Sequence, residues 1–419
     1  MHPTLAYRSV RISALIRCRG FRFSLHAYPL RHWLIGMKNT DPFPTPMKNF
    51  VKTKSFFFFC WKLLRAYNIF EIVDRTPRQP GKKTTLISMI RNEKGILETF
   101  CAHASSLFDR VILIDHLSSD GTREYIKLLS EKCSNIEYYC FDDPGYYQSE
   151  LMTWTVNQLV DKEMPGWVFF LDADEFLPFK SKEEFDRRLS KFSGFPVISM
   201  PWLNLVPFDM ENGRVIDEFF LKPPKPSRYH KIAFQPSRIP SNEYFIAQGN
   251  HDLFMGSRSL NIRFPAKKSF PIYHLPIRTK HQLREKIRYG VESYQRMGSD
   301  RQRKNGFHWD QIHRIMKDTS LTNEMMAGIT AQYSDTLHPP YERSFDELIK
   351  NGYSEMRMEI CCSKAVITFA DVAKGRKDEG IVKNDDPSID MNDGSSTNHW
   401  KIDFDRSTGF IRITVATCI

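Results

Sequence analysis

The stretch WVFFLDADEFL, residues 167–177, indicates the fold class more directly than any other part of the chain. Its first five residues are all apolar, which is typical of a strand that is buried on both faces of a sheet. Asp172 and Asp174 follow at once, and positions i and i+2 of an extended chain point to the same side. Open α/β sheets bind ligands beyond the carboxyl ends of such strands, so the two carboxylates are expected at a ligand site.

Three further apolar runs precede this strand and alternate with stretches of helical pattern. Strands are expected over 84–90, 111–114, 136–140 and 167–171, and helices over 96–107, 123–132, 148–162 and 280–297. This alternation predicts an α/β fold with a central, mostly parallel sheet that is flanked by helices. Short strands are also expected over 180–280 and 400–419.

The composition divides the chain into four parts. An α/β domain is expected over 81–300, a helical extension over 301–375, and an acidic linker with a short β tail over 376–419. Residues 1–80 hold 14 basic and 3 acidic residues, which account for the whole formal net charge of +11. This basic N-terminal extension is expected to be poorly ordered or to lie on a membrane surface. Because the rest of the chain is balanced, a groove for nucleic acid is not expected.

The cysteines and the longest apolar run bear on location. Eight cysteines are scattered, without a CxxC pair or histidines at zinc spacing. This pattern favours free thiols in a reducing compartment, and hence a cytoplasmic location. The run FFFFCWKLL at 56–64 is too short to span a bilayer and is flanked by basic residues. Attachment to an anionic membrane surface and burial as a strand or helix are both compatible with it.

The two aspartates that follow the fourth strand point to a particular chemistry. Neighbouring carboxylates repel one another, and a hard cation such as Mg²⁺ or Mn²⁺ relieves that repulsion. Such an ion leaves positions for phosphate oxygens and neutralises the charge that grows on a diphosphate leaving group. An ordinary acidic turn is the alternative interpretation of Asp172 and Asp174.

Several motifs in order along residues 84–295 resemble glycosyltransferase family 2, and in particular a subgroup with a DxDEFL motif. The matching segments are IRNE at 90–93, DHLSSDGT at 115–122, DADEFL at 172–177, QGNH at 248–251, and YHLPIRT at 273–279 followed by Gln282, Lys286 and Gly290. The resemblance implies a GT-A fold for residues 81–300. It also implies a nucleotide-diphosphate sugar donor, a glycan or lipid-linked acceptor as in polysaccharide biosynthesis, and usually inversion at the anomeric carbon.

The same resemblance suggests roles for individual residues. The donor would be held by Arg91, Asn92, Glu93, Asp115, Asp172 and Lys231. The metal would be held by Asp172 and Asp174, with His274 as the first histidine ligand and His251 as the second. An inverting transfer also needs a general base near the acceptor hydroxyl, for which the candidates are Glu218, Asp217 and Asp252. The acidic pair that many family 2 enzymes place before their acceptor helix has no clear equivalent.

Plainer interpretations stand beside these. Glu175 is expected to pair with a basic group, and Trp202 and Phe208 to be buried rather than stacked on a sugar. His274 is either a hydrogen-bonded core residue or a ligand. A nucleotidyltransferase is the alternative enzyme class, although the loop after residue 90 lacks the glycines of its phosphate loop. A glycosidase needs carboxylates on opposite sides of a bond, which neighbours on one strand end do not provide. A non-catalytic binding protein on a degenerate transferase fold is the third alternative.

Overall fold

The structure is a computed structural model, and the chain separates into two compact units, Met1–Pro77 and Arg78–Ile419. It describes residues 13–18, 21–26, 83–160, 166–211, 218–239, 244–255, 262–296, 307–318, 321–333, 337–362, 367–378, 399–405 and 410–416. In the first unit the described residues form a hairpin, in which β1 (Ser13–Cys18) pairs antiparallel with β2 (Phe21–His26). The apolar run at 56–64 lies outside the described residues.

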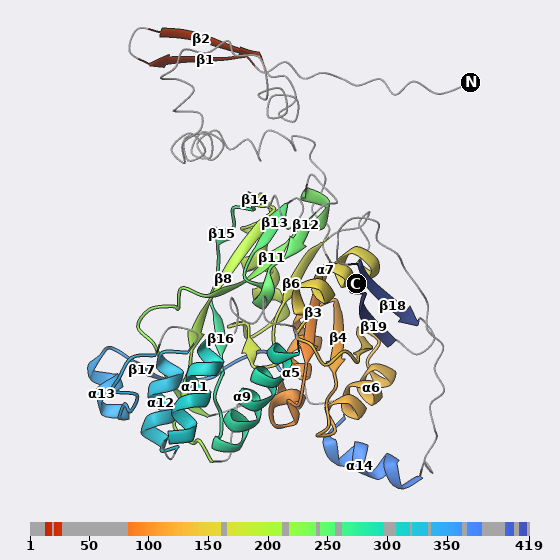
Figure 1. Cartoon of the computed structure of the whole chain (residues 1–419), viewed down its shortest axis with the longest axis vertical. Coiled ribbons are helices and arrows are strands. Elements are labelled where there is room, and N and C mark those ends of the chain that lie inside the picture. The colour runs from red at the N-terminus through yellow and green to blue at the C-terminus, as the bar shows by residue number, and fades with distance from the viewer. Residues whose placement is uncertain are drawn as a thin grey trace. The chain divides into compact units, whose positions relative to one another are not determined.

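The second unit is built on four parallel strands in the order β5-β4-β3-β6 (Figure 1). The strands are β3 (Thr84–Ile90), β4 (Arg110–His116), β5 (Ile136–Phe141) and β6 (Trp167–Phe170). The helices between them are α5 (Lys94–Leu107), α6 (Thr122–Lys132) and α7 (Gln148–Leu159). The four predicted strands and the three predicted helices between them are therefore present, and their ends agree to within three residues.

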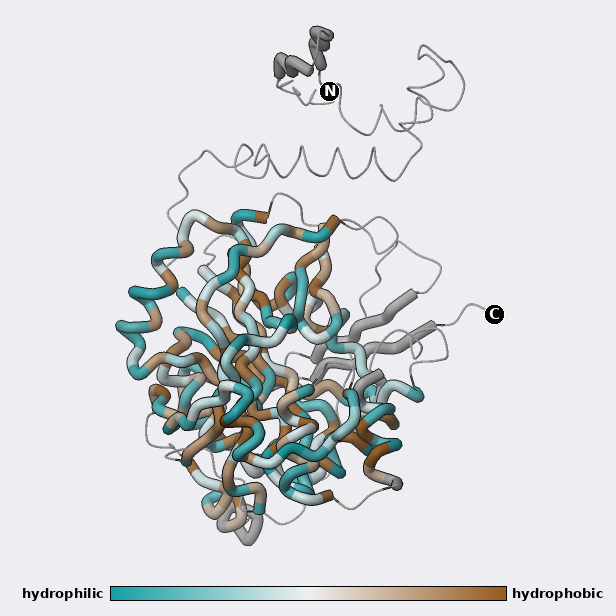
Figure 2. Tube along the Cα trace, turned by 90° about the vertical axis from the view of Figure 1, so that its left-hand side faces the viewer, coloured by the Kyte–Doolittle hydropathy of each residue, from teal (hydrophilic) through white to brown (hydrophobic). Residues whose placement is uncertain are grey.

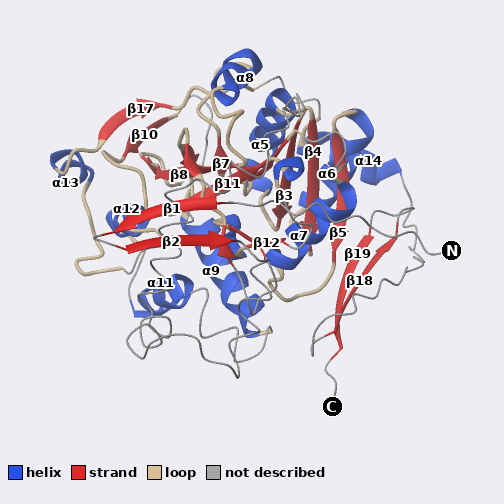
Figure 3. Ribbon diagram, turned by 90° about the horizontal axis from the view of Figure 1, so that it is seen from above, coloured by secondary structure: helices blue, strands red, loops and turns tan. Residues whose placement is uncertain are grey.

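Burial explains why these runs form the centre of the unit. Leu86 and Ile90 on one face of β3 pack with side chains of α5, α6 and α8 (Lys182–Ser190) in one apolar core. Ile87 on the other face is also completely buried, and α7 packs against that side. Figure 3 shows α5 and α8 on one side of the strands and α7 on the other. In Figure 2 the chain through the middle of this unit is mostly apolar.

Beyond β6 the sheet becomes mixed and curls. β11 (His230–Phe234) is antiparallel to both β6 and β8 (Val197–Asn204). β16 (Ile272–His274) then runs parallel to β8 and antiparallel to β7 (Glu175–Phe176). At the other edge β19 (Phe410–Ala416) runs parallel to β5 and pairs with β18 (His399–Asp405), so the predicted tail strands extend the same sheet. The observed fold is a mixed α/β fold with a curled, mostly parallel sheet flanked by helices.

A second apolar core is formed mainly by helices that follow β16 in the chain. Leu283 and Ile287 of α9 pack there with Met326 of α12 and Leu348 of α13. Its elements are α9 (Lys280–Gln295), α11 (Phe307–Asp318), α12 (Asn323–Ala331), α13 (Phe345–Lys350), and a sheet of β9 (Val206–Pro207), β10 (Phe219–Lys222) and β17 (Ser354–Arg357). Phe208 packs against Phe345 at its border, half-buried, as expected for a packing residue.

Short elements complete the unit. They are η2 (Pro236–Arg238), β12 (Tyr244–Ile246), η3 (Gln248–Asn250), β13 (Leu253–Met255), β14 (Ile262–Arg263), β15 (Lys267–Lys268) and α14 (Phe369–Asp378). Five cysteines of the second unit are free thiols: Cys101, Cys133, Cys140, Cys361 and Cys362. Within that part, no helix combines the length and the apolar character that crossing a bilayer requires.

Candidate functional site

A cavity of about 1010 Å³ opens beyond the carboxyl ends of the parallel strands. Its walls come from the segment after β3, the end of β4, the segment after β6, and helix α9. The residues predicted from sequence that line it are Arg91, Asn92, Glu93, Asp172, Asp174, Lys231, His251 and His274. Most of the predicted donor and metal residues therefore share one cavity, although they come from distant parts of the sequence.

Asp172 and Asp174 lie in a tight turn rather than in an extended segment. The Glu175 amide donates to the Asp172 carbonyl oxygen at 3.0 Å, and the Glu175 carboxylate accepts from the Asp172 amide at 2.9 Å. The expected extended geometry at 172–174 is wrong, because Glu175 closes the chain on itself directly after β6. Asp172 and Asp174 nevertheless both line the cavity.

A buried lysine neutralises the first of the two aspartates. Lys231 of β11 places its Nζ 2.7 Å from Asp172 Oδ2 and 3.6 Å from Glu175 Oε1. Gln148 of α7 donates to the other oxygen of Asp172 at 3.3 Å. Burial is the main cause that raises the pKa of Glu175 well above its ordinary value. Glu175 thus pairs with a basic group, as expected, and also shapes the turn that carries Asp172.

A second lysine pairs with Asp174. Lys286 of α9 lies with Nζ 2.5 Å from Asp174 Oδ2 and also donates to the Pro276 carbonyl at 3.3 Å. Burial alone would raise the pKa of Asp174, but Lys286, His274 and Arg278 outweigh it and lower the pKa below its ordinary value. Asp174 is therefore a carboxylate at neutral pH, although only 2% of its surface is exposed.

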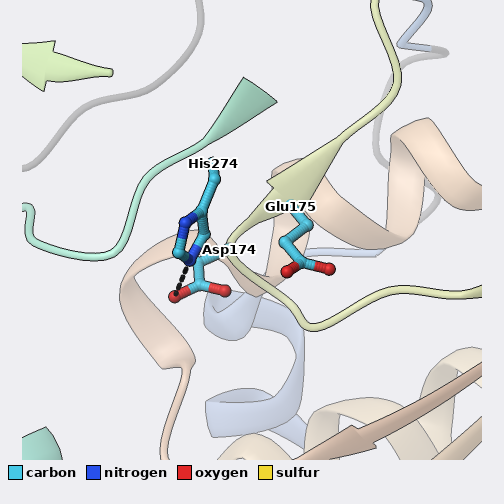
Figure 4. A group of neighbouring side chains, drawn as sticks. All are labelled: Asp174, Glu175 and His274. Carbon is cyan, nitrogen blue, oxygen red and sulfur yellow. Dashed lines mark ion pairs between the residues drawn. The ribbon is translucent and has the colours of Figure 1, made fainter. Parts of the chain in front are cut away.

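His274 faces Asp174 from strand β16 (Figure 4). Its Nδ1 donates to Asn204 Oδ1 at 2.8 Å, so the lone pair is on Nε2, which lies 3.9 Å from Asp174 Oδ2. Burial lowers the pKa of His274 to about 3, and the ring is neutral at physiological pH. A neutral imidazole nitrogen beside a carboxylate, with its other nitrogen held by a hydrogen bond, is the usual arrangement of a metal ligand.

The residues around Asp174 fit a divalent cation. Among the described residues, Asp174, Glu175 and His274 bring one ligating atom each to within 4.8 Å of one another. Asp172 and His251 are not part of that group. His251 lines the same cavity, where its Nδ1 donates to the His230 carbonyl at 2.5 Å and its ring packs edge-on to Trp202.

The loops after β3 and β4 hydrogen-bond to one another at the cavity wall. Ser118 Oγ accepts from the Asn92 amide at 3.0 Å, and Asn92 Oδ1 accepts from the Ser119 amide at 2.8 Å. Glu93 forms an ion pair of 2.5 Å with Arg278. Asp115 lies behind these loops, completely buried and paired with Arg123 at 2.7 Å, and it is not among the residues that line the cavity.

The three candidates for the general base lie elsewhere or outside the described residues. Asp217 falls in the undescribed segment 212–217. Glu218 precedes β10, and its carbonyl oxygen accepts from the Met358 amide. Asp252 is tied to Arg263 at 2.6 Å. Neither Glu218 nor Asp252 lines the cavity, so this assignment stays a prediction.

Comparison with known proteins adds little to this geometry. No protein-family model matches the chain, and no curated protein matches it. One similar solved structure is that of the mannosyltransferase PcManGT from Pyrobaculum calidifontis in complex with GDP-Man and Mn²⁺. The match covers 66% of this chain and 80% of that one, at 11% sequence identity and a TM-score of 0.29. A likeness this distant assigns neither an activity nor a ligand to this chain.

Two groups of cavity residues had no role assigned from sequence. One comprises Arg278, which belongs to the YHLPIRT motif at 273–279, and Lys286, which belongs to the Gln282, Lys286 and Gly290 spacing. The other is an aromatic cluster of Tyr146, Tyr294 and Trp309, whose ring centroids are 5.3 to 5.7 Å apart.

Trp202 and Gly290 show how packing shapes the cavity wall. Trp202 is only 5% exposed, as expected for a packing residue, yet it lines the cavity beside His274. A Cβ at Gly290 would lie 2.3 Å from the Trp309 ring, so glycine is needed where α9 meets α11.

Proposed function

We propose that this chain is a glycosyltransferase that moves a sugar from a nucleotide-diphosphate sugar to a carbohydrate acceptor. The observation that carries the proposal is a single cavity with carboxylates and cations at the strand ends and an aromatic cluster from α9 and α11. A sugar nucleotide needs charged groups for its diphosphate and apolar rings for its sugar faces. The family resemblance of the sequence motifs points to the same reaction class.

The donor side of the cavity suits a diphosphate. Lys231, Arg278 and Lys286 all lie within ion-pair distance of carboxylates at the cavity floor. Lysine binds phosphate oxygens as a point charge, and arginine binds them through the N–H donors of its planar guanidinium group. The braced loops of Asn92 and Ser118 would hold the nucleoside part.

A divalent cation, Mg²⁺ or Mn²⁺, is part of the proposal. Asp174 and His274 are its proposed ligands, with Asp172 close by on the same turn. Bound there with the donor, the ion would neutralise the negative charge that develops on the leaving diphosphate. Burial lowers the pKa of His274 and keeps its ring neutral, and the hydrogen bond to Asn204 fixes the orientation of the ring.

The acceptor side suits a glycan, either free or lipid-linked. Flat aromatic faces bind sugar rings through their apolar faces, and Tyr146, Tyr294 and Trp309 line the cavity with their rings. Inversion at the anomeric carbon would require a carboxylate near the acceptor hydroxyl. Glu218, Asp217 and Asp252 remain the proposed bases, and association of residues 1–80 with a membrane surface of the cytoplasm remains part of the same proposal.

A thermal-shift panel tests the function. The intact protein is mixed with UDP-, GDP- and dTDP-sugars, each with Mn²⁺ and with a chelator, because a ligand that binds the folded state raises its melting temperature. At least one sugar nucleotide should stabilise the protein and then be consumed with an acceptor glycan. Stabilisation by nucleoside triphosphate and sugar phosphate, with pyrophosphate released, would instead identify a nucleotidyltransferase.

A further inference from the structure

The carboxylates proposed to hold the cation are already paired with cationic side chains of the protein. Seven ionisable groups form ion pairs at the cavity, and all of them except Glu175 line it: Glu93, Asp172, Asp174, Glu175, Lys231, Arg278 and Lys286. They are called the ion-pair cluster. Four acids thus face three bases. Each of the four acids lies within ion-pair distance of one of the three bases.

Carboxylates that are already paired with ammonium and guanidinium groups are poorly suited to binding a free divalent cation. Asp174 Oδ2 lies 2.5 Å from the Lys286 ammonium, so the best ligand oxygen is occupied and a second cation would be repelled. A sugar nucleotide that carries two negative charges on its diphosphate forms a neutral complex with Mn²⁺. The cationic side chains of the cluster therefore repel that complex less than they repel the bare ion.

The two lysines differ in their freedom to move. The Lys231 side chain is 1% exposed and is held by both Asp172 and Glu175. The Lys286 side chain is 20% exposed, lines the cavity from α9, and has one carboxylate partner. A lysine carries its charge on a flexible four-carbon stem. Lys286 can consequently leave Asp174 for a phosphate oxygen in the cavity, provided that the entering cation takes its place beside the buried Asp174 carboxylate.

We propose that Lys286 couples cation binding to donor binding by exchanging Asp174 for the donor's diphosphate. In the free protein its ammonium pairs with the Asp174 carboxylate, and its positive charge repels divalent cations from that ligand. When the diphosphate arrives, the ammonium moves to it, and Asp174 becomes available to the cation that enters with the donor. This inference rests on the proposed function and assigns Lys286 as a positioning residue for that reaction.

Binding measurements on the intact chain test the exchange. The affinity for Mn²⁺ is measured by electron paramagnetic resonance, with and without saturating UDP, GDP or dTDP. In the wild-type protein the nucleotide that binds should raise the affinity for Mn²⁺ by about tenfold, and Mn²⁺ should raise the affinity for that nucleotide equally. Equal Mn²⁺ affinities with and without the bound nucleotide would overturn the proposal.

The Lys286→Met variant separates this exchange from simple bridging of the cation by a nucleotide. It should bind Mn²⁺ alone about tenfold more tightly than the wild type, and the coupling should shrink by the same factor. Lys280→Met is the matched control, because Lys280 lies on the same helix in a surface ion pair of 2.9 Å with Glu211. Lys286→Arg keeps the charge and should keep the low affinity for the free ion. Unchanged Mn²⁺ affinity in Lys286→Met would contradict the assignment.

The same data separate failure of this inference from failure of the proposed function. If a nucleotide binds but neither its affinity nor that of Mn²⁺ depends on the other, the exchange is wrong and the transferase proposal stands. If none of the three nucleotides binds with or without Mn²⁺, the proposed function itself is wrong. Should Lys286→Met fail to fold, Lys286→Gln, which also removes the charge, takes its place in the Mn²⁺ titration with the same expected result.

Discussion

Lys231 Nζ lies 2.7 Å from Asp172 Oδ2, although 59 residues separate the two in the chain. The register of β11 against β6 pairs Ala233 with Phe169, which brings Lys231 beside the turn that follows β6. A completely buried ammonium is stable only beside its counter-charges, and here they are Asp172 and Glu175. The pair therefore joins the antiparallel half of the sheet to the proposed site.

Replacing this lysine should destabilise the protein strongly. Lys231→Met removes the charge that balances Asp172 and Glu175 and should lower the free energy of unfolding by about 3 kcal/mol. Lys280→Met, which removes a surface ion pair, should lower it by less than about 1 kcal/mol. Urea unfolding of both variants measures the difference. Similar losses in the two variants would show that Lys231 is not energetically tied to the turn.

A pair of variants separates stability from activity at Asp174. Asp174→Asn leaves Lys286 without its counter-charge and should lower the free energy of unfolding by about 3 kcal/mol. The double variant Asp174→Asn with Lys286→Met removes both charges and should regain most of that stability. Neither variant should turn over a sugar nucleotide, because both lack the proposed metal ligand. Turnover by the double variant would remove Asp174 from the site.

Two helical glycines should respond in opposite ways to alanine. In Gly290→Ala the new Cβ would lie 2.3 Å from Trp309, so overpacking should destabilise the protein by about 2 kcal/mol. In Gly95→Ala the new Cβ meets nothing within 4 Å, and a small gain of about 0.5 kcal/mol is expected. Gly290→Ala should also weaken acceptor binding more than nucleotide binding. Thermal unfolding and separate titrations measure both effects, and a stabilised Gly290→Ala would contradict the packing.

His103 should make the protein sensitive to acid. Its Nδ1 donates to the Cys361 carbonyl at 2.7 Å, its Nε2 accepts from the Leu177 amide at 3.1 Å, and burial lowers its pKa from 6.5 to about 4. Below pH 6.5 the unfolded chain binds a proton that the folded state does not, so stability falls as pH falls toward 4.

The His103→Gln variant measures this contribution. It should be less stable at pH 7, yet it should lose about 2 kcal/mol less than the wild type between pH 7 and pH 5. Urea unfolding at the two pH values gives the slope, and His338→Gln at an exposed position controls for the substitution itself. Parallel slopes for the wild type and His103→Gln would show that this histidine titrates normally in the folded protein.

The sequence was sufficient for the parallel half of the fold because a continuous apolar run reports burial on both faces directly. β3, β4 and β6 contain such runs, whereas β5 includes Glu137 and is only partly buried. The antiparallel half was predicted only as short strands, since the positions of β8, β11 and β16 depend on pairing across the sheet. The contact between Lys231 and Asp172 also depends on this pairing across the sheet, so the sequence did not predict it.

The site was predicted in part for a similar reason. The carboxylates of Asp172 and Asp174 follow from a local motif, whereas the direction in which Lys286 points follows from the packing of α9 against α11 and α12. The turn at Asp172–Glu175 was not predicted because it depends on the Glu175 carboxylate, which accepts a hydrogen bond from the Asp172 amide. The aromatic cluster has no sequence signal, because its members come from separate elements that meet only in the folded chain.

On α9, Gln282, Lys286 and Gly290 recur every four residues, and each makes a different contact with the cavity wall. An α-helix turns by about 100° per residue, so one inserted or deleted residue between them would rotate those that follow onto another face. Length changes in this helix would thus disturb ion pairing and aromatic packing together. Homologous chains that share this chemistry should vary in length at their loops and keep this helix free of gaps.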